Sequence, residues 1–501
     1  MMSEDISKYR ELETAGKGSI KNREALLGLL LAVLAGILLD RVLLNGLGGF
    51  GFSILMCSLI VLYLVMLRGN LKLKGNSGLL WFIPISVMIF RSTFYDNEII
   101  HGLNIMFLPI VMTGGALAVW FHNLEYHRPI SNICSHIFAY PLLNLLKPLS
   151  VIKKLLPSRK DLKGVKINPH FLAGVLLSIP LLLIVLAFLS SADQMFNYYV
   201  GQFLNSFNFM KSWHISDETL VHIFIITGGS LYFFAFVWSF TVRKTSQPFG
   251  SKFEIEALTI SVPVSLLNIV YLFFSVIQFS YLYGGGTLPA GFTYAEYARR
   301  GFFELVAVTV INFTIILVGV NRTKVSGRRQ SSFCNLLFTL LILFTFNMLY
   351  SAYYKMRLYE NTYGYTYLRV YVSLFMLLLL ILNLSALVAI WYKKISLYKA
   401  VVIVSISFYT LINLFNADAY IAKANIEVYR HTGRIDAKYL TTLSNDAVPY
   451  LLELSSDTSP DVAAVIQNDL NKRRINLNSK DKSTNILQFN FSRQHARRLL
   501  R

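Results

Sequence analysis

Long apolar runs separated by short polar and basic loops make up most of the chain. A helix needs about 20 mostly apolar residues to cross the hydrocarbon core of a bilayer. This pattern predicts an all-α fold, a polytopic transmembrane helical bundle of about 11 spans with a small helical C-terminal extramembrane domain. Residues 25–121 hold spans 1–4 and residues 170–414 hold spans 5–11. The predicted spans are 25–44, 50–67, 78–95, 102–121, 170–190, 219–240, 258–281, 301–320, 333–353, 368–391 and 397–414.

Composition agrees with a membrane location. Of the 501 residues, 54% are hydrophobic and only 15% are charged, whereas a soluble domain carries about 25% charged residues. The formal net charge is +20, and most basic residues lie between the apolar runs. This placement is typical of contact with a lipid bilayer and its anionic headgroups, and we expect no nucleic-acid partner because the sequence has no compact basic domain.

Basic residues in alternate loops predict the orientation of the spans. Residues 1–24 hold five basic residues and the long loop 122–169 holds eight, which by the positive-inside rule places both in the cytoplasm. The N-terminal segment 1–24 is therefore cytoplasmic, the C-terminus is extracytoplasmic, and the protein belongs in the plasma membrane. We interpret residues 133–156 as an amphipathic helix on the inner leaflet. If it spans the membrane instead, every later loop changes sides.

The tail after the last span has helix signals of its own. Gly433 ends a helix that begins near 417, Asp436 is placed to cap the next, and Ser444 or Asn445 caps a third that has Pro449 in its early turns. These signals predict a helical extracytoplasmic domain over 415–470. Residues 471–501 are polar and basic, so we expect a loosely ordered tail, with a short helix near 492–501.

Three long motifs resemble a known family. They are TYAEYARRGFFELV (293–306), RLYENTYGYTYLRVY (357–371) and NADAYIAKANIEVYRHTGRIDAKYLTTLSNDAVPYLLEL (416–454). The chain resembles a bacterial membrane-protein family known as domain of unknown function 4173, related to 4153, over about 170–455. The resemblance implies the fold and the membrane location, and it brings no activity with it.

The predicted topology places these three motifs on one face of the membrane. Glu296 and Arg300, and Arg300 and Glu304, stand four residues apart and can pair on one helix face. Arg357 and Arg369 flank a turn at Gly364, so they can grip a carboxylate or phosphate, or pair instead with Glu296, Glu360 or Asp418. The candidate outer-face site comprises Tyr294, Glu296, Arg299, Arg300, Glu304, Arg357, Tyr363, Arg369 and Asp418. The alternative is an interfacial salt-bridge network that anchors helices.

The middle of the spans carries amides rather than ionisable groups. A candidate intramembrane polar cluster consists of Asn268, Asn312, Asn347 and Asn383. Such residues line a shared polar path, or they form interhelical hydrogen bonds that hold a bundle together, which is the commoner use.

Recognised catalytic and cofactor motifs are absent. The sequence has no GxxxxGK[ST], HExxH or GxSxG motif, and its histidines do not cluster at metal-ligand spacing. We therefore expect no cofactor and no metal, and the lack of a catalytic motif favours a protein without enzymatic activity while leaving an enzyme open.

These features favour an integral membrane protein of the bacterial cell envelope that acts as a sensor, an assembly partner or a regulatory scaffold, with other envelope proteins among its partners. A transporter or channel through spans 7–10 is the first alternative. A membrane-embedded transferase acting on an outer-leaflet lipid or glycan is the second, with Glu296 as its base.

Overall fold

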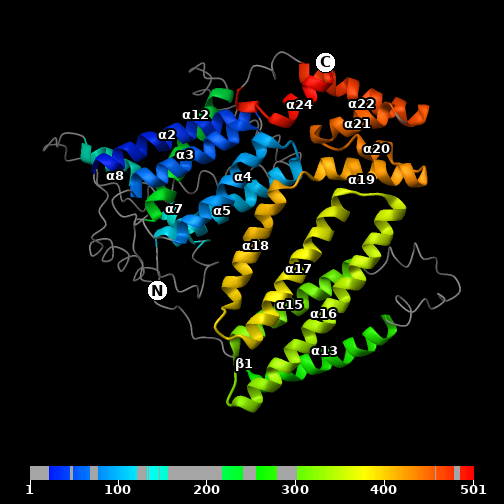
Figure 1. Cartoon of the computed structure of the whole chain (residues 1–501). Helices are drawn as coiled ribbons and strands as arrows, with labels where there is room; N and C mark the ends of the chain where they lie inside the picture. The colour runs from blue at the N-terminus through cyan, green and yellow to red at the C-terminus, as the bar shows by residue number, and fades with distance from the viewer. Residues whose placement is uncertain are drawn as a thin grey trace, which may run out of the picture. The chain divides into compact units, whose positions relative to one another are not determined.

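The computed structural model describes residues 22–45, 49–67, 77–120, 133, 135–145, 147–155, 217–240, 255–278, 302–456, 458–478 and 486–501. These residues are almost entirely helical (Figure 1), so the all-α polytopic fold is confirmed. Nine described helices are long and apolar enough to cross a membrane, and Gly78–Phe94 is a shorter apolar helix. The predicted span 170–190 and the loop 157–169 lie outside the described residues.

The described residues divide into two compact units. Unit 1 comprises the described parts of Met1–Phe90 and Leu103–Thr245 together with Ile486–Phe489; unit 2 comprises those of Arg91–Gly102, Ser246–Asn485 and Asn490–Arg501. The hairpin of α4 and α5 is thus shared between them, with its tip, residues 91–102, in unit 2.

Unit 1 is built around the pair α2 and α12. Its elements are α2 (Asn22–Asn45), α3 (Phe50–Leu67), the 3-10 helices η1 (Ser77–Trp81) and η5 (Ile486–Gln488), most of α4 (Phe82–Phe94) and α5 (Glu98–Trp120), the π-helical turn η2 (Ser135–Ala139), α7 (Tyr140–Leu143), α8 (Lys147–Leu155) and α12 (Asp217–Ser239). At Gly36 a Cβ atom would lie 2.5 Å from the carbonyl oxygen of Ile226. A residue without a side chain therefore lets these two apolar helices approach closely.

The segment predicted as one amphipathic helix over 133–156 is broken. It folds as η2, α7 and α8, the longest of which has nine residues. None of these pieces is long enough to cross a bilayer. Tyr232 of α12 donates a hydrogen bond of 2.9 Å to the carbonyl oxygen of Ile137, so this segment packs on the unit 1 bundle.

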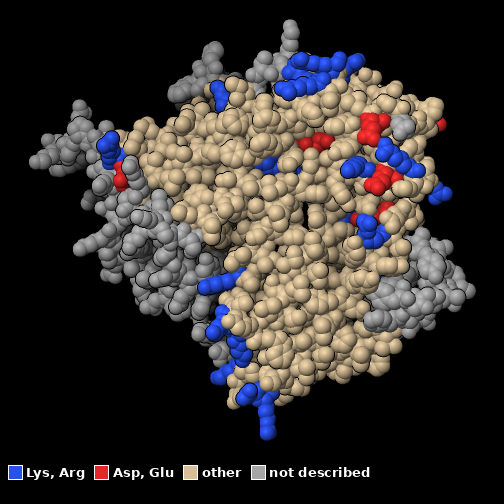
Figure 2. Space-filling model, viewed as in Figure 1, with Lys and Arg blue, Asp and Glu red and all other residues tan. Residues whose placement is uncertain are grey.

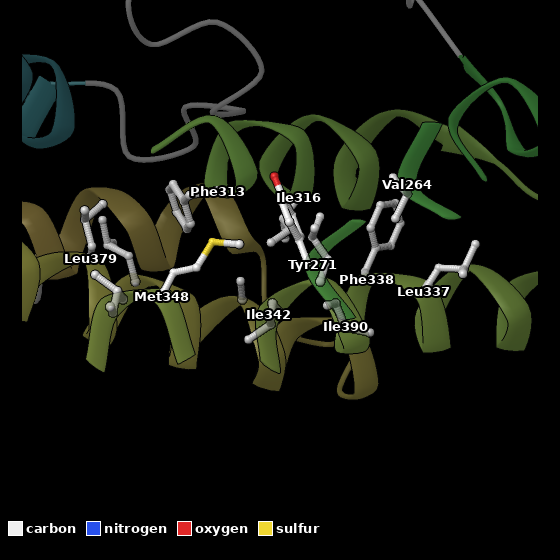
Figure 3. Packing of buried hydrophobic residues seen from close by; sticks show 14 of the residues in the cluster. Val264, Tyr271, Phe313, Ile316, Leu337, Phe338, Ile342, Met348, Leu379 and Ile390 are labelled. Carbon is white, nitrogen blue, oxygen red and sulfur yellow. The ribbon is translucent and has the colours of Figure 1, made fainter. Parts of the chain in front are cut away.

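Unit 2 contains a bundle of five helices. They are α13 (Ala257–Gln278), α15 (Phe302–Arg322), α16 (Arg328–Tyr363), α17 (Tyr367–Trp391) and α18 (Leu397–Leu414). Apolar side chains from α13, α15, α16 and α17 form its core, and Figure 3 shows Tyr271, Phe313 and Met348 among them. Two short parallel strands, β1 (Ile255–Glu256) and β2 (Thr323–Lys324), pair at one end of the bundle.

Helix α16 is longer than the predicted span. Its 36 residues extend about 54 Å at 1.5 Å per residue, against a hydrocarbon core of about 30 Å. Its polar ends therefore extend past the apolar stretch predicted at 333–353. The turn between α16 and α17 lies at one of these ends.

The tail, the described part of residues 415–501, packs against the turn between α16 and α17. Its elements are α19 (Ala417–Thr432), α20 (Ala437–Leu440), the 3-10 helix η4 (Asn445–Ala447), α21 (Val448–Ser456), α22 (Pro460–Asn478) and α24 (Phe491–Leu499). The predicted signals are confirmed at Gly433, which is left-handed at φ 68°, and at Asp436 and Ser444, whose side chains cap α20 and η4. A second core joins Tyr365 and Val370 of the bundle to α19–α24. Helix α22 continues to Asn478, past the residue where we expected loose order to begin, because Arg473 ties it to the carbonyl oxygens of Thr441 and Leu443.

Candidate functional site

The predicted outer-face site is only partly visible. Tyr294, Glu296, Arg299 and Arg300 lie outside the described residues. Glu304, Arg357, Tyr363, Arg369 and Asp418 are described, and all of them belong to unit 2. Glu304 occupies the first turn of α15 and interacts electrostatically with Lys355 of α16.

Arg357 and Arg369, predicted as candidates to bind phosphate, contact other residues of the chain. Arg357 forms an ion pair of 3.3 Å with Glu360 and donates a hydrogen bond of 2.9 Å to the hydroxyl of Tyr365. Arg369 donates to the carbonyl oxygens of Tyr363 and Gly364, and its guanidinium lies 4.2 Å from the centre of the Tyr359 ring. The pairing of Arg357 with Glu360 is one of the alternatives drawn from the sequence. Both arginines hold the α16–α17 turn in place.

Asp418 is the residue of the predicted set that joins distant segments. It lies in the first turn of α19 and its side chain is fully buried. Its Oδ2 accepts a hydrogen bond of 2.5 Å from Asn97, at the tip of the α4–α5 hairpin. Its Oδ1 accepts one from the hydroxyl of Tyr367 and one of 2.7 Å from the backbone N–H of Ser444. A single carboxylate thus ties the hairpin tip, the start of α17 and the tail together, and three donors satisfy its buried charge.

A second set of contacts holds the same hairpin tip. Asp96 forms an ion pair of 2.7 Å with Arg493 of α24 and accepts a hydrogen bond of 2.6 Å from Asn445. Its backbone N–H donates to Asp446 at 2.8 Å. Because Asp446 is buried, the loss of hydration raises the pKa of its carboxyl group above the ordinary value, and the hydrogen bond from the Asp96 amide opposes this rise.

Arg91 is a buried cation beside these carboxylates. Its guanidinium donates one hydrogen bond of 2.7 Å to the carbonyl oxygen of Asn413 and lies 4.7 Å from the centre of the Tyr95 ring. Asp446 and Asp418 both attract its charge. Among the described residues, its Nε and Nη2 atoms have no hydrogen-bond partner. Arg91 therefore balances part of the negative charge buried at this end of unit 2.

Asn425 of α19 fastens the tail to the α16–α17 turn. Its Oδ1 accepts from the backbone N–H of Tyr365 and its Nδ2 donates to the carbonyl oxygen of the same residue, both at 2.8 Å. Gly364 allows this close approach, because it adopts φ 75° and a Cβ atom there would clash with the Asn425 Oδ1 atom. We refer to the following residues and their bonding partners as the docking network: Arg91, Asp96, Asn97, Asp418, Asn425 and Asp446.

The predicted intramembrane asparagines are separate hydrogen-bonding groups. Asn312 joins Tyr271, at 2.8 Å, to Thr345, at 3.0 Å, whereas Asn347 donates to Ser275 at 3.0 Å. Asn268 donates to the carbonyl oxygen of Leu337 on α16, and Asn383 donates within its own helix. The contacts of Asn268, Asn312 and Asn347 join neighbouring helices, as in the hydrogen-bonded alternative considered from the sequence, whereas that of Asn383 does not.

Sequence reasoning missed much of the docking network. Asn97 precedes α5 and caps it, since its Oδ1 accepts from Ile100 N–H at 2.9 Å, and a capping pattern signals a helix start rather than a tertiary contact. The sequence does not single out Asp96, Asp446 or Arg91, because the bond of Asp96 to Asp446 and that of Arg91 to Asn413 each join residues more than 300 positions apart. In the part of the chain that the structure describes, no group of three or more His, Cys, Asp or Glu side chains could hold a metal ion. The network can bind and position segments of the chain.

Comparison with known proteins places the chain in a family. The model of the domain of unknown function DUF4153 matches residues 77–454, which begins nearer the N-terminus than the similarity drawn from the motifs. The comparison shows this family and does not show the related family 4173 that those motifs suggested. No curated protein and no solved structure matches the chain significantly. Since the matched region covers more than half of the chain and includes both the α4–α5 hairpin and most of the docking network, this multi-pass helical membrane protein belongs to the DUF4153 family.

Proposed function

We propose that this protein is a non-enzymatic membrane protein of the bacterial cell envelope, a sensor or assembly scaffold. Its tail is the surface that binds a partner. The observation that carries this proposal is the buried Asp418 carboxylate, which receives hydrogen bonds from the hairpin tip, from α17 and from the tail. Truncating one partner of a buried charged contact is strongly destabilising. A partner that pulls on the tail would therefore change the packing of α17 and of the hairpin tip.

The polar groups of the bundle favour this function over transport. Asn312 and Asn347, which we considered as the lining of a path, are used in bonds between α13, α15 and α16. Arg357 and Arg369, which we considered as a grip for a carboxylate or phosphate, hold the α16–α17 turn. Transport and lipid transfer each need these groups to face a ligand, and transport is the alternative outcome of the test below.

The tail offers a basic surface with apolar side chains for a partner. Lys472, Arg474 and Arg498 are exposed on α22 and α24, and Ile475 of α22 is 70% exposed beside them. Figure 2 shows basic side chains gathered over this part of the tail. Acidic residues with an apolar neighbour are the complementary partner chemistry, because such surfaces combine electrostatic steering with apolar burial.

We propose that the tail faces the outside of the plasma membrane. The two linkers at the other end of the unit 2 bundle, 321–332 and 392–399, hold seven basic residues and no acidic ones, which supports a cytoplasmic position for that end. In a chain whose native cysteines are replaced, a cysteine at Lys394 should be labelled only from the cytoplasm and one at Arg430 only from outside. Labelling of both from the same side would contradict the orientation.

The function is tested by complementation in cells that lack the gene. The double variant Arg474→Glu and Arg498→Glu reverses the exposed charges of the tail, and Asn347→Ala removes a polar group from the bundle. We expect the tail variant to reach the membrane in normal amount and fail to restore the deletion phenotype, whereas Asn347→Ala and the control Arg434→Glu restore it. Loss of function in Asn347→Ala, with the tail variant fully active, would favour a transport path and refute the proposal.

A further inference from the structure

A polar pocket lies at the basic end of unit 2, opposite the α16–α17 turn along the bundle helices. It has a volume of about 320 Å³ and is lined by three segments: the end of α15 with β2, the start of α16, and the linker from α17 to α18. That volume falls within the range of about 300–1,000 Å³ typical of small-molecule sites. The polar side chains in its wall are Asn321, Thr323, Ser331, Asn335, Lys393 and Ser396.

The charge of the pocket is positive. Lys393 is its charged lining residue, and its Nζ donates a hydrogen bond of 3.0 Å to Ser331 Oγ. Arg322, Lys324 and Lys394 neighbour the lining residues in sequence. In Figure 2 this end of the bundle, low in the view, shows basic side chains without acidic ones. The acidic residue Glu256 lies on β1 beside Lys324 and is not part of the lining. An anion therefore fits the pocket better than a cation.

Neutral donors in the wall favour an oxygen-rich anion. The Oγ1 atom of Thr323 is buried and has no hydrogen-bond partner among the described residues, a state that costs about 1–3 kcal/mol unless a ligand relieves it. Ser396 precedes α18, and its side chain makes no capping bond to that helix. A phosphate group presents several acceptor oxygens to hydroxyl, amide and ammonium donors at once.

We infer that this pocket binds a phosphate group, with Lys393 supplying the charge and Thr323 a neutral hydrogen bond. The group is carried by an anionic phospholipid headgroup or by a small soluble phosphate compound. The site is separate from the docking network and does not depend on the proposed function. Binding would link the end of α15 to the α17–α18 linker.

The purified full chain tests the inference in lipid nanodiscs. One arm compares nanodiscs of phosphatidylcholine with nanodiscs containing phosphatidylglycerol, and counts bound phosphatidylglycerol by native mass spectrometry. The other arm adds inorganic phosphate to phosphatidylcholine nanodiscs and measures the shift in melting temperature, with chloride of equal ionic strength as the reference. Retention of phosphatidylglycerol assigns the pocket to a headgroup, and a phosphate-specific shift assigns it to a soluble compound.

Three variants decide whether the pocket is responsible. We expect Lys393→Gln to weaken binding about tenfold and Thr323→Val, which keeps shape and charge, to weaken it about threefold. The matched control Lys394→Gln removes the same charge one residue away from the lining and should change affinity less than twofold. Equal effects of Lys393→Gln and Lys394→Gln would mean a general surface attraction and overturn the inference. So would the absence of phosphate binding in both arms.

Discussion

Replacing Asp418 by asparagine tests how the tail is held. In the native structure Oδ1 accepts from Tyr367 and from Ser444 N–H, whereas Oδ2 accepts from the Asn97 amide nitrogen at 2.5 Å. An asparagine can keep the first two bonds, but its amide nitrogen then faces that of Asn97, donor against donor. Asn97 cannot flip its amide without losing the cap to Ile100 N–H.

The expected cost follows from these contacts. The loss is one of two alternatives: without a flip the hydrogen bond from Asn97 is lost, which for a bond to a charged group costs about 1.5–3 kcal/mol, and with a flip the N-cap is lost, which costs about 0.5–2 kcal/mol. Removing a buried negative charge recovers part of this. We expect a net loss of about 1–2 kcal/mol, which corresponds to a roughly 5- to 30-fold rise in the equilibrium constant for local opening.

Hydrogen exchange measured by mass spectrometry reads this opening directly. Peptides covering 91–102 and 417–446 should lose protection in Asp418→Asn, and those of α13 should not. Glu427→Gln, which makes the same chemical change on the exposed face of α19, is the matched control and should leave protection unchanged.

A compensating double variant tests whether the hydrogen bond between residues 97 and 418 holds the tail. In Asp418→Asn combined with Asn97→Asp, the two side chains exchange their roles. The amide introduced on α19 can donate to the carboxylate introduced at the hairpin tip, and that carboxylate still caps α5. The double variant should therefore recover most of the lost protection, although each single variant is destabilised. If the double variant is no more protected than Asp418→Asn alone, the assigned hydrogen bonds do not hold the tail.

Two further predictions concern the turn and the buried acid. Gly364 has φ 75° and ψ −174°, a region open essentially to glycine, so Gly364→Ala should cost about 1–3 kcal/mol besides the clash with Asn425. Its melting temperature should fall well below that of Gly327→Ala, where a Cβ meets nothing within 4 Å; equal melting temperatures would show that the turn adapts freely. The folded-state pKa of Asp446 is raised above 3.8 by burial, so its ionisation opposes folding as the pH rises through that raised pKa. Wild type should thus gain stability relative to Asp446→Asn when the pH is lowered from about 7 through that range, and melting curves of the two proteins that shift in parallel with pH would contradict this.

The sequence alone determined the helical elements. Most long apolar runs in the described region became helices close to their predicted limits, as at 50–67 and 397–414, because a bilayer span must satisfy its backbone hydrogen bonds internally and expose apolar side chains. The caps at Gly433 and Asp436 were equally local, since the partner atoms lie within four residues.

Tertiary structure alone decided which polar side chains meet. Asn97 and Asp418 are 321 positions apart, and their contact exists because the hairpin tip, the start of α17 and the tail pack in one unit. The pocket at Lys393 likewise requires three segments to converge. Periodicity and capping are short-range properties, and they predict where helices form. A binding site depends instead on how those helices pack. The packing is determined by the complementary shapes of many side chains at once, which short-range patterns do not reveal.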